Sequence, residues 1–143
     1  MAINTKFKVI NHNTLCALTI SGKRYYGLAE CHPDDIPLFS QRVGERLAYN
    51  RASIDYLREE RDKINEQIKS LKNLLSIYNQ SQKTNKESYE YKMLQRQINI
   101  YIKDSKELSR AIKEIKEEDT KYVRERAQLL KQTKTVNDNS GCV

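Results

Sequence analysis

The amino-acid sequence predicts an α+β protein. A small N-terminal antiparallel three-stranded β-meander precedes a long two-helix antiparallel coiled-coil hairpin, and the whole chain is expected to be oligomeric. Only four Gly and two Pro occur in 143 residues and 31% of the residues are charged, which is typical of long helices with a solvated surface. Apolar residues alternate near the N-terminus, whereas from residue 54 they recur every three and four positions. These features exclude an all-β fold and a TIM-barrel enzyme.

Three short segments near the N-terminus are rich in β-branched and apolar residues, which predicts strands at residues 6–10, 14–20 and 24–31. Turn-prone triplets at residues 11–13 and 21–23 separate them, so consecutive strands form an antiparallel meander. One face of such a sheet needs a cover. The residues expected on that face are Cys16, Leu18 and Ile20 or their alternates.

A helix that follows the strands can supply this cover. Asp34 or Asp35 is a suitable N-cap, and Pro37 is tolerated in a first turn. Gly44 costs about 1 kcal/mol relative to Ala inside a helix, so we expect a close approach of helix to sheet there, in preference to a phosphate contact. Apolar residues recur every four positions on the face that would lie on the sheet. They are Phe39, Val43 and Leu47.

From residue 54 the apolar residues follow a heptad pattern. The pattern predicts one helix over about residues 38–79, a polar turn at residues 79–86 and a second long helix, which together form an antiparallel hairpin. The seam positions are Ile54, Leu57, Arg61, Ile64, Ile68, Leu71, Leu75 and Tyr78 in the first helix, and Leu94, Ile98, Tyr101, Ser105, Leu108, Ile112, Ile115, Asp119 and Tyr122 in the second.

Apolar residues outside this seam need another surface to pack against, so the sequence predicts at least a homodimer. They include Leu74, Ile77, Ile100, Ile102, Val123, Leu129 and Leu130. The small polar residues from Thr133 onward predict a disordered tail. The predicted organisation is therefore the meander with the start of the first helix at residues 1–52, the helical hairpin at 53–132 and the tail at 133–143.

Charge and cysteine content limit the partners and the compartment. The 26 Lys and Arg residues outnumber 19 Asp and Glu, and the net charge of +7 favours phosphate-bearing or polyanionic partners. We expect no signal peptide, no membrane span and no membrane partner, because no apolar run is long enough. An odd number of cysteines fits a reducing, cytoplasmic location. Cys16 and Cys31 are expected to be buried thiols, and the sequence assigns no role to Cys142.

Side chains with catalytic potential are scarce, so we expect a protein that is not an enzyme. There are only two histidines, no Gly-x-Ser-x-Gly elbow and no Gly-rich phosphate loop. A zinc site of His12, Cys16, Cys31 and His32 is disfavoured, because the last two are adjacent and no Cys-x-x-Cys spacing supports it. Neither a metal nor a cofactor is predicted.

Tyrosines set among arginines are the most distinctive feature of the composition, since the chain has nine Tyr and no Trp. Arg binds phosphate groups bidentately and Tyr rings stack on bases, so a nucleotide or a nucleic acid is a natural partner. Intrahelical salt bridges with nearby acidic residues are the alternative role for each arginine. The candidate ligand-binding residues lie where the last strand meets the first helix. They are Arg24, Tyr26, His32, Arg42, Arg46 and Arg51.

The run GKRYYGLAECHPDD at residues 22–35, followed by Phe39, Gly44, Leu47-Ala48 and Arg51-Ala52, resembles small proteins encoded by phages of low-GC bacteria. The layout of an N-terminal sheet and two long helices in an oligomer is also similar to the phage Thoeris anti-defence proteins. Those proteins bind and sequester a cyclic ADP-ribose isomer made by the host's TIR-domain enzyme, without cleaving it.

This resemblance implies a phage-encoded, non-enzymatic anti-defence protein in the host cytoplasm. Its ligand would be a nucleotide-derived host immune signal, either a cyclic ADP-ribose isomer or a cyclic oligonucleotide, held in a pocket between protomers. Two alternatives stay open from the residues themselves. One is a basic oligomeric nucleic-acid-binding protein, and the other is a coiled-coil protein that binds and inhibits a host protein.

Overall fold

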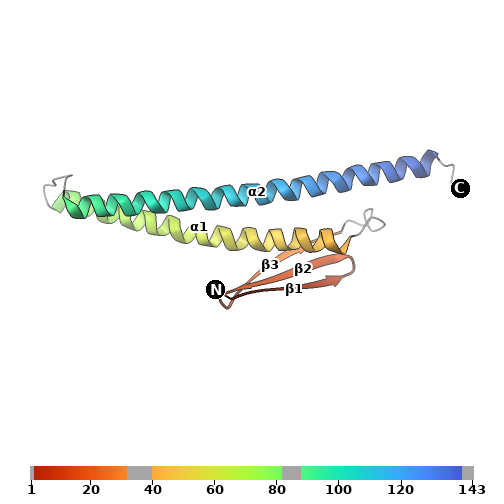
Figure 1. Cartoon of the computed structure of the whole chain (residues 1–143), viewed down its shortest axis with the longest axis horizontal. Helices are drawn as coiled ribbons and strands as arrows, with labels where there is room; N and C mark the ends of the chain where they lie inside the picture. Colours follow the sequence, from red (N-terminus) through yellow and green to blue (C-terminus); the bar gives the residue numbers. More distant parts are fainter. Residues whose placement is uncertain (1, 32–39, 82–87, 140–143) are drawn as a thin grey trace. The chain divides into compact units, whose positions relative to one another are not determined.

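A computed structural model describes residues 2–31, 40–81 and 88–139, with the backbone alone described at residues 81, 130 and 132–139. Three strands precede two long helices (Figure 1), which confirms the predicted α+β class. The elements are β1 (Ile3–Ile10), β2 (Asn13–Ile20), β3 (Lys23–Ala29), α1 (Gln41–Ser81) and α2 (Tyr89–Asn139). The chain forms two compact units, a sheet unit (Met1–Tyr56 with Lys113–Val143) and a hairpin unit (Leu57–Ile112).

The three strands form one antiparallel sheet in the order β1-β2-β3, so the predicted meander is confirmed. Both connections are two-residue turns, which are tighter than the expected triplets. Asn11 and His12 have φ angles of 51° and 68°, and Ser21 and Gly22 have φ angles of 51° and 84°. Two successive positive φ angles define a type I′ turn, whose twist matches that of the flanking strands.

The core of the sheet unit lies between the sheet and α1. Successive side chains of β2 and β3 point to opposite faces of the sheet, so one row of them points toward Ala48 and Ala52 of α1. This row holds Cys16, Leu18, Ile20, Tyr25 and Ala29. Burial raises the pKa of the Cys16 thiol by desolvation. The Tyr25 and Tyr56 rings extend the core with an edge-to-face contact at 5.3 Å between centroids.

The helix approaches the sheet closely at Gly27 of β3. A Cβ atom at this position would overlap the carbonyl oxygen of Ala48 and lie 2.6 Å from the backbone nitrogen of Ala52. Both neighbours are backbone atoms, which cannot rotate away as a side chain can. Glycine on the strand and alanines on the helix therefore set the distance between the two layers.

Serine hydroxyls cap both helices. Ser40 Oγ accepts a hydrogen bond from the Val43 backbone N–H at 3.4 Å, and Ser88 Oγ accepts one from Tyr91 at 3.3 Å. The N-caps expected at Asp34 or Asp35, together with Pro37 and Phe39, lie outside the described residues.

Helix α2 continues to Asn139, past residue 132 where composition predicts an end. The chain has neither Gly nor Pro between Gly44 and Gly141, so no residue of the helix breaks it.

The heptad register is confirmed, because every predicted seam residue is buried or half-buried. Ile98 and Ile112 are only 2% and 4% exposed. Leu74, Ile77 and Ile100 lie off the seam of the hairpin unit and are about half exposed, as expected, whereas Ile102 is half-buried. Val123 and Leu129 are likewise exposed, and the side chain of Leu130 is outside the described part. In the described part of the chain, no helix has the length and apolar character to cross a membrane.

Candidate ligand-binding groove

A groove lies beside α1 because the helix does not cover the whole sheet. The register places Ile3 beside Ile20 and Phe7 beside Cys16, so these β1 side chains share the helix-facing side. Ile20 and Cys16 are buried, yet Ile3 is 61% and Phe7 40% exposed. The inner side of β1 therefore remains accessible along its length.

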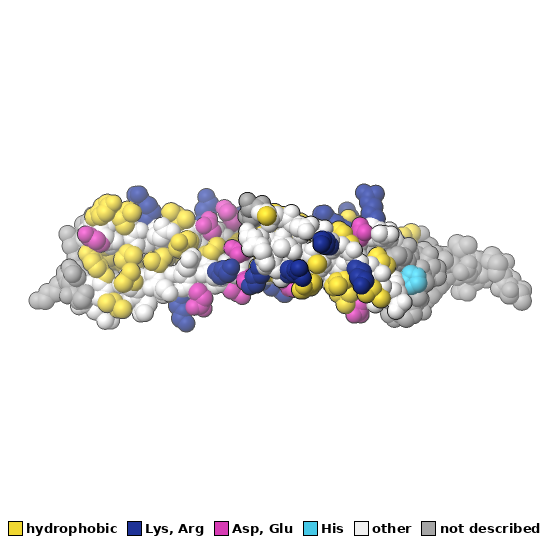
Figure 2. Space-filling view, turned by 90° about the horizontal axis from the view of Figure 1, so that it is seen from below, with side chains coloured by type: hydrophobic (Ala, Val, Ile, Leu, Met, Phe, Trp, Pro, Cys, Tyr) yellow, Lys and Arg dark blue, Asp and Glu magenta, His cyan; other side chains and the backbone are white. Residues whose placement is uncertain are grey.

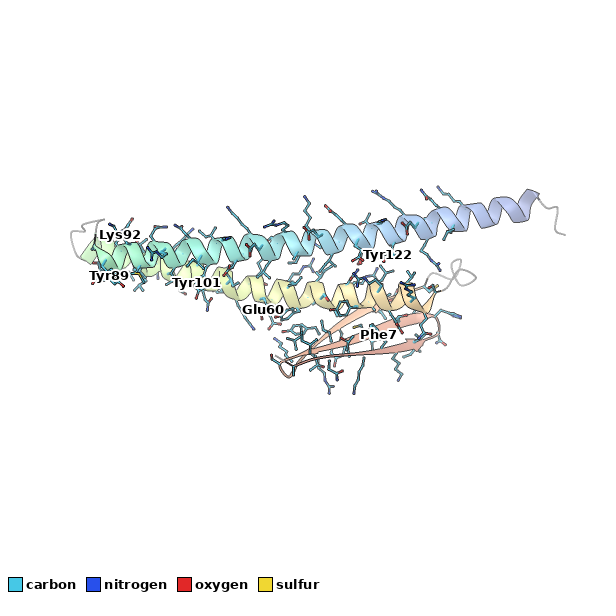
Figure 3. The ribbon with its side chains drawn as sticks, in the orientation of Figure 1. Phe7, Glu60, Tyr89, Lys92, Tyr101 and Tyr122 are labelled. Carbon is cyan, nitrogen blue, oxygen red and sulfur yellow. The ribbon has the colours of Figure 1, made fainter. Side chains whose placement is uncertain are left out.

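The groove has a volume of about 840 Å³, which is within the range of small-molecule sites. Its walls come from three elements of the sheet unit, and Figure 3 labels Phe7 on β1 and Tyr122 on α2. The lining residues are Thr5 and Phe7 of β1, Arg42, Val43, Glu45, Arg46 and Tyr49 of α1, and Glu118 and Tyr122 of α2. Three aromatic rings and two guanidinium groups thus border one space.

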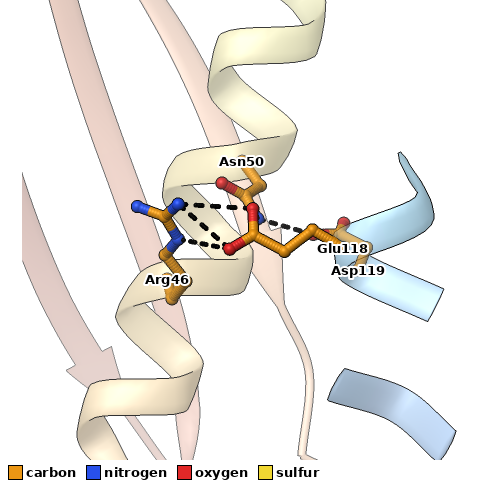
Figure 4. A network of polar contacts seen from close by, with 4 residues as sticks. All are labelled: Arg46, Asn50, Glu118 and Asp119. Atoms are coloured by element: carbon orange, nitrogen blue, oxygen red, sulfur yellow. Dashed lines mark hydrogen bonds and ion pairs between the residues drawn. The ribbon is translucent and has the colours of Figure 1, made fainter. Parts of the chain in front are cut away.

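A polar network fixes one side of the groove (Figure 4). Arg46 Nε donates to Glu118 Oε1 at 3.0 Å, and Arg46 Nη2 donates to Oε2 at 3.3 Å. Asn50 is 2% exposed, and its Nδ2 donates to Glu118 Oε2 at 3.1 Å and to Asp119 Oδ1 at 2.8 Å. This two-point contact orients the Arg46 guanidinium and leaves its Nη1 atom for another acceptor.

The structure divides the predicted binding residues among several places. Arg42 and Arg46, both on α1, line the same groove. Arg51 has a structural position instead, because its Nη1 donates to the Leu28 carbonyl oxygen at 2.6 Å and its Nε lies 3.7 Å from Asp119 Oδ2. His32 lies outside the described residues.

Arg24 and Tyr26 do not join the groove. Along β3, Tyr25, Gly27 and Ala29 are buried toward α1, so the alternate residues point to the opposite side of the sheet. The expected convergence of Arg24 and Tyr26 with the helix arginines is therefore wrong, since strand alternation separates the two groups.

The sequence alone assigns neither Phe7 nor Tyr122 to the site. Phe7 has the pattern of an ordinary inward strand residue, and Tyr122 occupies the last predicted seam position. One feature of the sequence could have indicated Phe7. β1 is the edge strand of a meander, and a single helix leaves the inner side of an edge strand partly uncovered. Tyr49 was recognisable from its place among the helix arginines.

The described lining of the groove consists of aromatic, aliphatic, basic, acidic and hydroxyl side chains. No histidine or cysteine is among the described residues that line it. Glu45 accepts a hydrogen bond from Gln41 at 3.0 Å, and Glu118 is engaged by Arg46 and Asn50. No carboxylate among the described residues pairs with Arg42, whose side chain also lines the groove.

In the part of the chain that the structure describes, no group of three His, Cys, Asp or Glu side chains could hold a metal ion. The fold and the groove together define a sheet-and-hairpin protein with a candidate binding groove. Comparison with protein-family models, with curated proteins and with solved structures gives no match.

Proposed function

We propose that this protein is a non-enzymatic binding protein that sequesters a nucleotide-derived host immune signal, namely a cyclic ADP-ribose isomer or a cyclic oligonucleotide. The supporting observation is the groove in which Phe7, Tyr49 and Tyr122 border the guanidinium groups of Arg42 and Arg46. Such a ligand carries both a planar base and phosphate, which match the two kinds of side chain. The resemblance to phage anti-defence proteins supports a role in the host cytoplasm.

Arg42 provides the first phosphate contact in this proposal. It lies one helical turn before Arg46, so both guanidinium groups can reach the same anion. Glu118 already binds Nε and Nη2 of Arg46. Nη1 of Arg46 therefore provides a second contact to the phosphate, weaker than that of Arg42. The aromatic rings hold the base by stacking, which needs no specific base edge.

Sequestration requires that the ligand be bound and released unchanged. Purified protein is incubated with a cyclic ADP-ribose isomer and, separately, with a cyclic oligonucleotide, and free ligand is measured by mass spectrometry after filtration. We expect depletion of the free ligand, followed by recovery of the intact compound after heat denaturation. A cleaved product or undiminished free ligand would refute the proposal.

The variant Arg42→Gln tests the site. Loss of one charge-assisted hydrogen bond costs about 1.5–3 kcal/mol, so affinity should fall by about 10-fold to 150-fold. Arg58→Gln is the matched control, because Arg58 is an exposed arginine on the same helix and does not line the groove. Equal affinities of the two variants would place the ligand elsewhere.

The predicted homo-oligomer of at least two chains is part of this proposal. Exposed apolar residues of the hairpin unit support it, because large apolar patches on a surface are typical of association sites. They are Leu74, Ile77, Tyr89, Met93 and Ile100. Light scattering at micromolar concentration should give a mass at least twice that of the 16.8 kDa chain, and a stable 16.8 kDa species would contradict this.

A further inference from the structure

The outer face of the sheet, which points away from α1, is a second surface with its own chemistry. Strand pairing defines its three rows across the sheet. The rows are Asn4, Thr19 and Arg24; Lys6, Ala17 and Tyr26; and Lys8, Leu15 and Leu28. No described element packs against these side chains, since Lys6, Lys8, Arg24, Tyr26 and Leu28 are all exposed.

Positive charge is segregated on this face. The first acidic residue of the chain is Glu30, so all three strands lack Asp and Glu. The same strands carry four cations, of which Lys6, Lys8 and Arg24 belong to the outer rows. Figure 2 views the protein from the side of the sheet and shows dark blue Lys and Arg side chains over this region. Elsewhere in the chain, acidic residues are interleaved with basic ones, which weakens the local potential.

An exposed aromatic ring lies among these cations. Tyr26 is 51% exposed, and its neighbour across the strand pair is Ala17, whose small side chain leaves the ring face accessible. Arg24 is two residues away on the same strand face, at about 7 Å, and Lys6 is two strands away, at about 9.5 Å. A base can therefore stack on Tyr26 while its flanking phosphates contact the basic side chains.

We infer that the outer face of the sheet binds single-stranded nucleic acid, with Tyr26 as the stacking platform and Lys6, Lys8 and Arg24 as phosphate contacts. The exposed cations favour a polyanionic ligand. The exposed Tyr26 ring favours a polyanion whose bases are unpaired and can stack on it. This inference is independent of the proposed groove ligand, because Arg42 and Arg46 lie on the other side of the sheet.

Salt dependence gives the first test. Fluorescence anisotropy is measured with labelled 20-nucleotide oligo-U RNA and oligo-dT DNA between 50 and 200 mM NaCl. Three phosphate contacts predict a slope of about −2 for the logarithm of affinity against the logarithm of salt concentration. Lys6→Gln combined with Lys8→Gln should reduce the magnitude of that slope by about 1.4. The affinities for the RNA and the DNA oligonucleotide show which of the two single-stranded nucleic acids the outer face prefers.

Tyr26→Thr tests the stacking platform and keeps a residue that favours strands. Affinity should fall by about 5-fold to 150-fold, the usual effect of removing one base-stacking aromatic. Val9→Thr is the matched control, because Val9 is 40% exposed on the inner side of β1 and does not belong to the outer face. Circular dichroism of both variants checks that they fold.

Any one of the following results would overturn the inference. They are the absence of oligonucleotide binding, an equal loss of affinity in Tyr26→Thr and Val9→Thr, and competition by poly-glutamate as effective as competition by oligo-U. Double-stranded DNA that binds as well as the single strand would equally exclude a stacked base. The groove variant Arg42→Gln should bind oligonucleotide normally, so failure here and failure of the proposed function are distinguishable.

Discussion

Helices α1 and α2 contact each other mainly through polar groups in the sheet unit and mainly through apolar groups in the hairpin unit. In the sheet unit, Arg46, Asn50 and Arg51 of α1 bind Glu118 and Asp119 of α2. In the hairpin unit the seam is mainly Leu and Ile. A few polar contacts interrupt it, such as Ser105 Oγ donating to Asn65 Oδ1 at 2.7 Å.

The difference follows from what each part of α1 packs against. In the sheet unit, the apolar side of α1 is occupied by the sheet, with Ala48 and Ala52 against Gly27. The side that meets α2 is mainly polar there, and its contacts include several hydrogen bonds and ion pairs. In the hairpin unit no sheet is present, so the apolar side of α1 is available to α2. At each point along its length, the single apolar face of an amphipathic helix can pack against one apolar partner only.

The apolar seam should be the more sensitive of the two contacts. Ile112→Asp places an unpaired carboxylate at a site that is 4% exposed, and should lower the free energy of unfolding by about 4 kcal/mol or more. Ile112→Val should cost only about 1 kcal/mol. Urea denaturation followed by circular dichroism measures both. A stably folded Ile112→Asp protein would mean that the seam contributes little.

The close contact of sheet and helix should be the next most sensitive. Gly27→Ala forces the backbone of α1 away from β3, and should cost about 3 kcal/mol. Gly22→Asn is the control, because nothing lies within 4 Å of Gly22 and Asn tolerates its φ of 84°. If both variants unfold at the same urea concentration, the sheet does not dictate the distance between the layers.

Asn50→Ala tests the buried part of the polar contact. It removes two hydrogen bonds to carboxylates at a site that is 2% exposed, and should cost about 2 kcal/mol. Asn99→Ala on the exposed surface of α2 should change stability by less than about 0.5 kcal/mol. Thermal denaturation gives the midpoint temperature of each variant. Equal midpoints would show that the hydrogen bonds of Asn50 do not stabilise the fold.

Arg46→Gln should have the smallest effect on stability. Its side chain is 50% exposed and that of Glu118 is 31% exposed, so the ion pair contributes less than about 1 kcal/mol. The difference from wild type should shrink further in 1 M NaCl, because salt screens exposed charges. Lys63→Gln, in an exposed intrahelical pair of the hairpin unit, is the comparison. A loss above 2 kcal/mol would show that the exposed ion pair, and not Asn50, dominates the polar contact.

Local patterns in the sequence predicted the elements because their signals are contained within a few residues. Alternation identified β2 and β3, and Ser21-Gly22 supplied a turn with two positive φ angles. Heptad spacing correctly placed Ile98 and Ile112 at buried positions. Asp119 also fell at a predicted seam position, but the pattern gave no indication that Asn50 would bind it.

The sequence by itself determined the fold class, the strand order of the meander and the seam of the hairpin, since hydrophobic period and turn residues act over short distances. Only the tertiary structure decided that Phe7, Arg42 and Tyr122 border one groove and that Arg24 and Tyr26 belong to the opposite face of the sheet. The physical reason is that both depend on where α1 lies on the sheet. That position is set at Gly27, Ala48 and Ala52 by a steric contact between residues more than 20 positions apart in the chain.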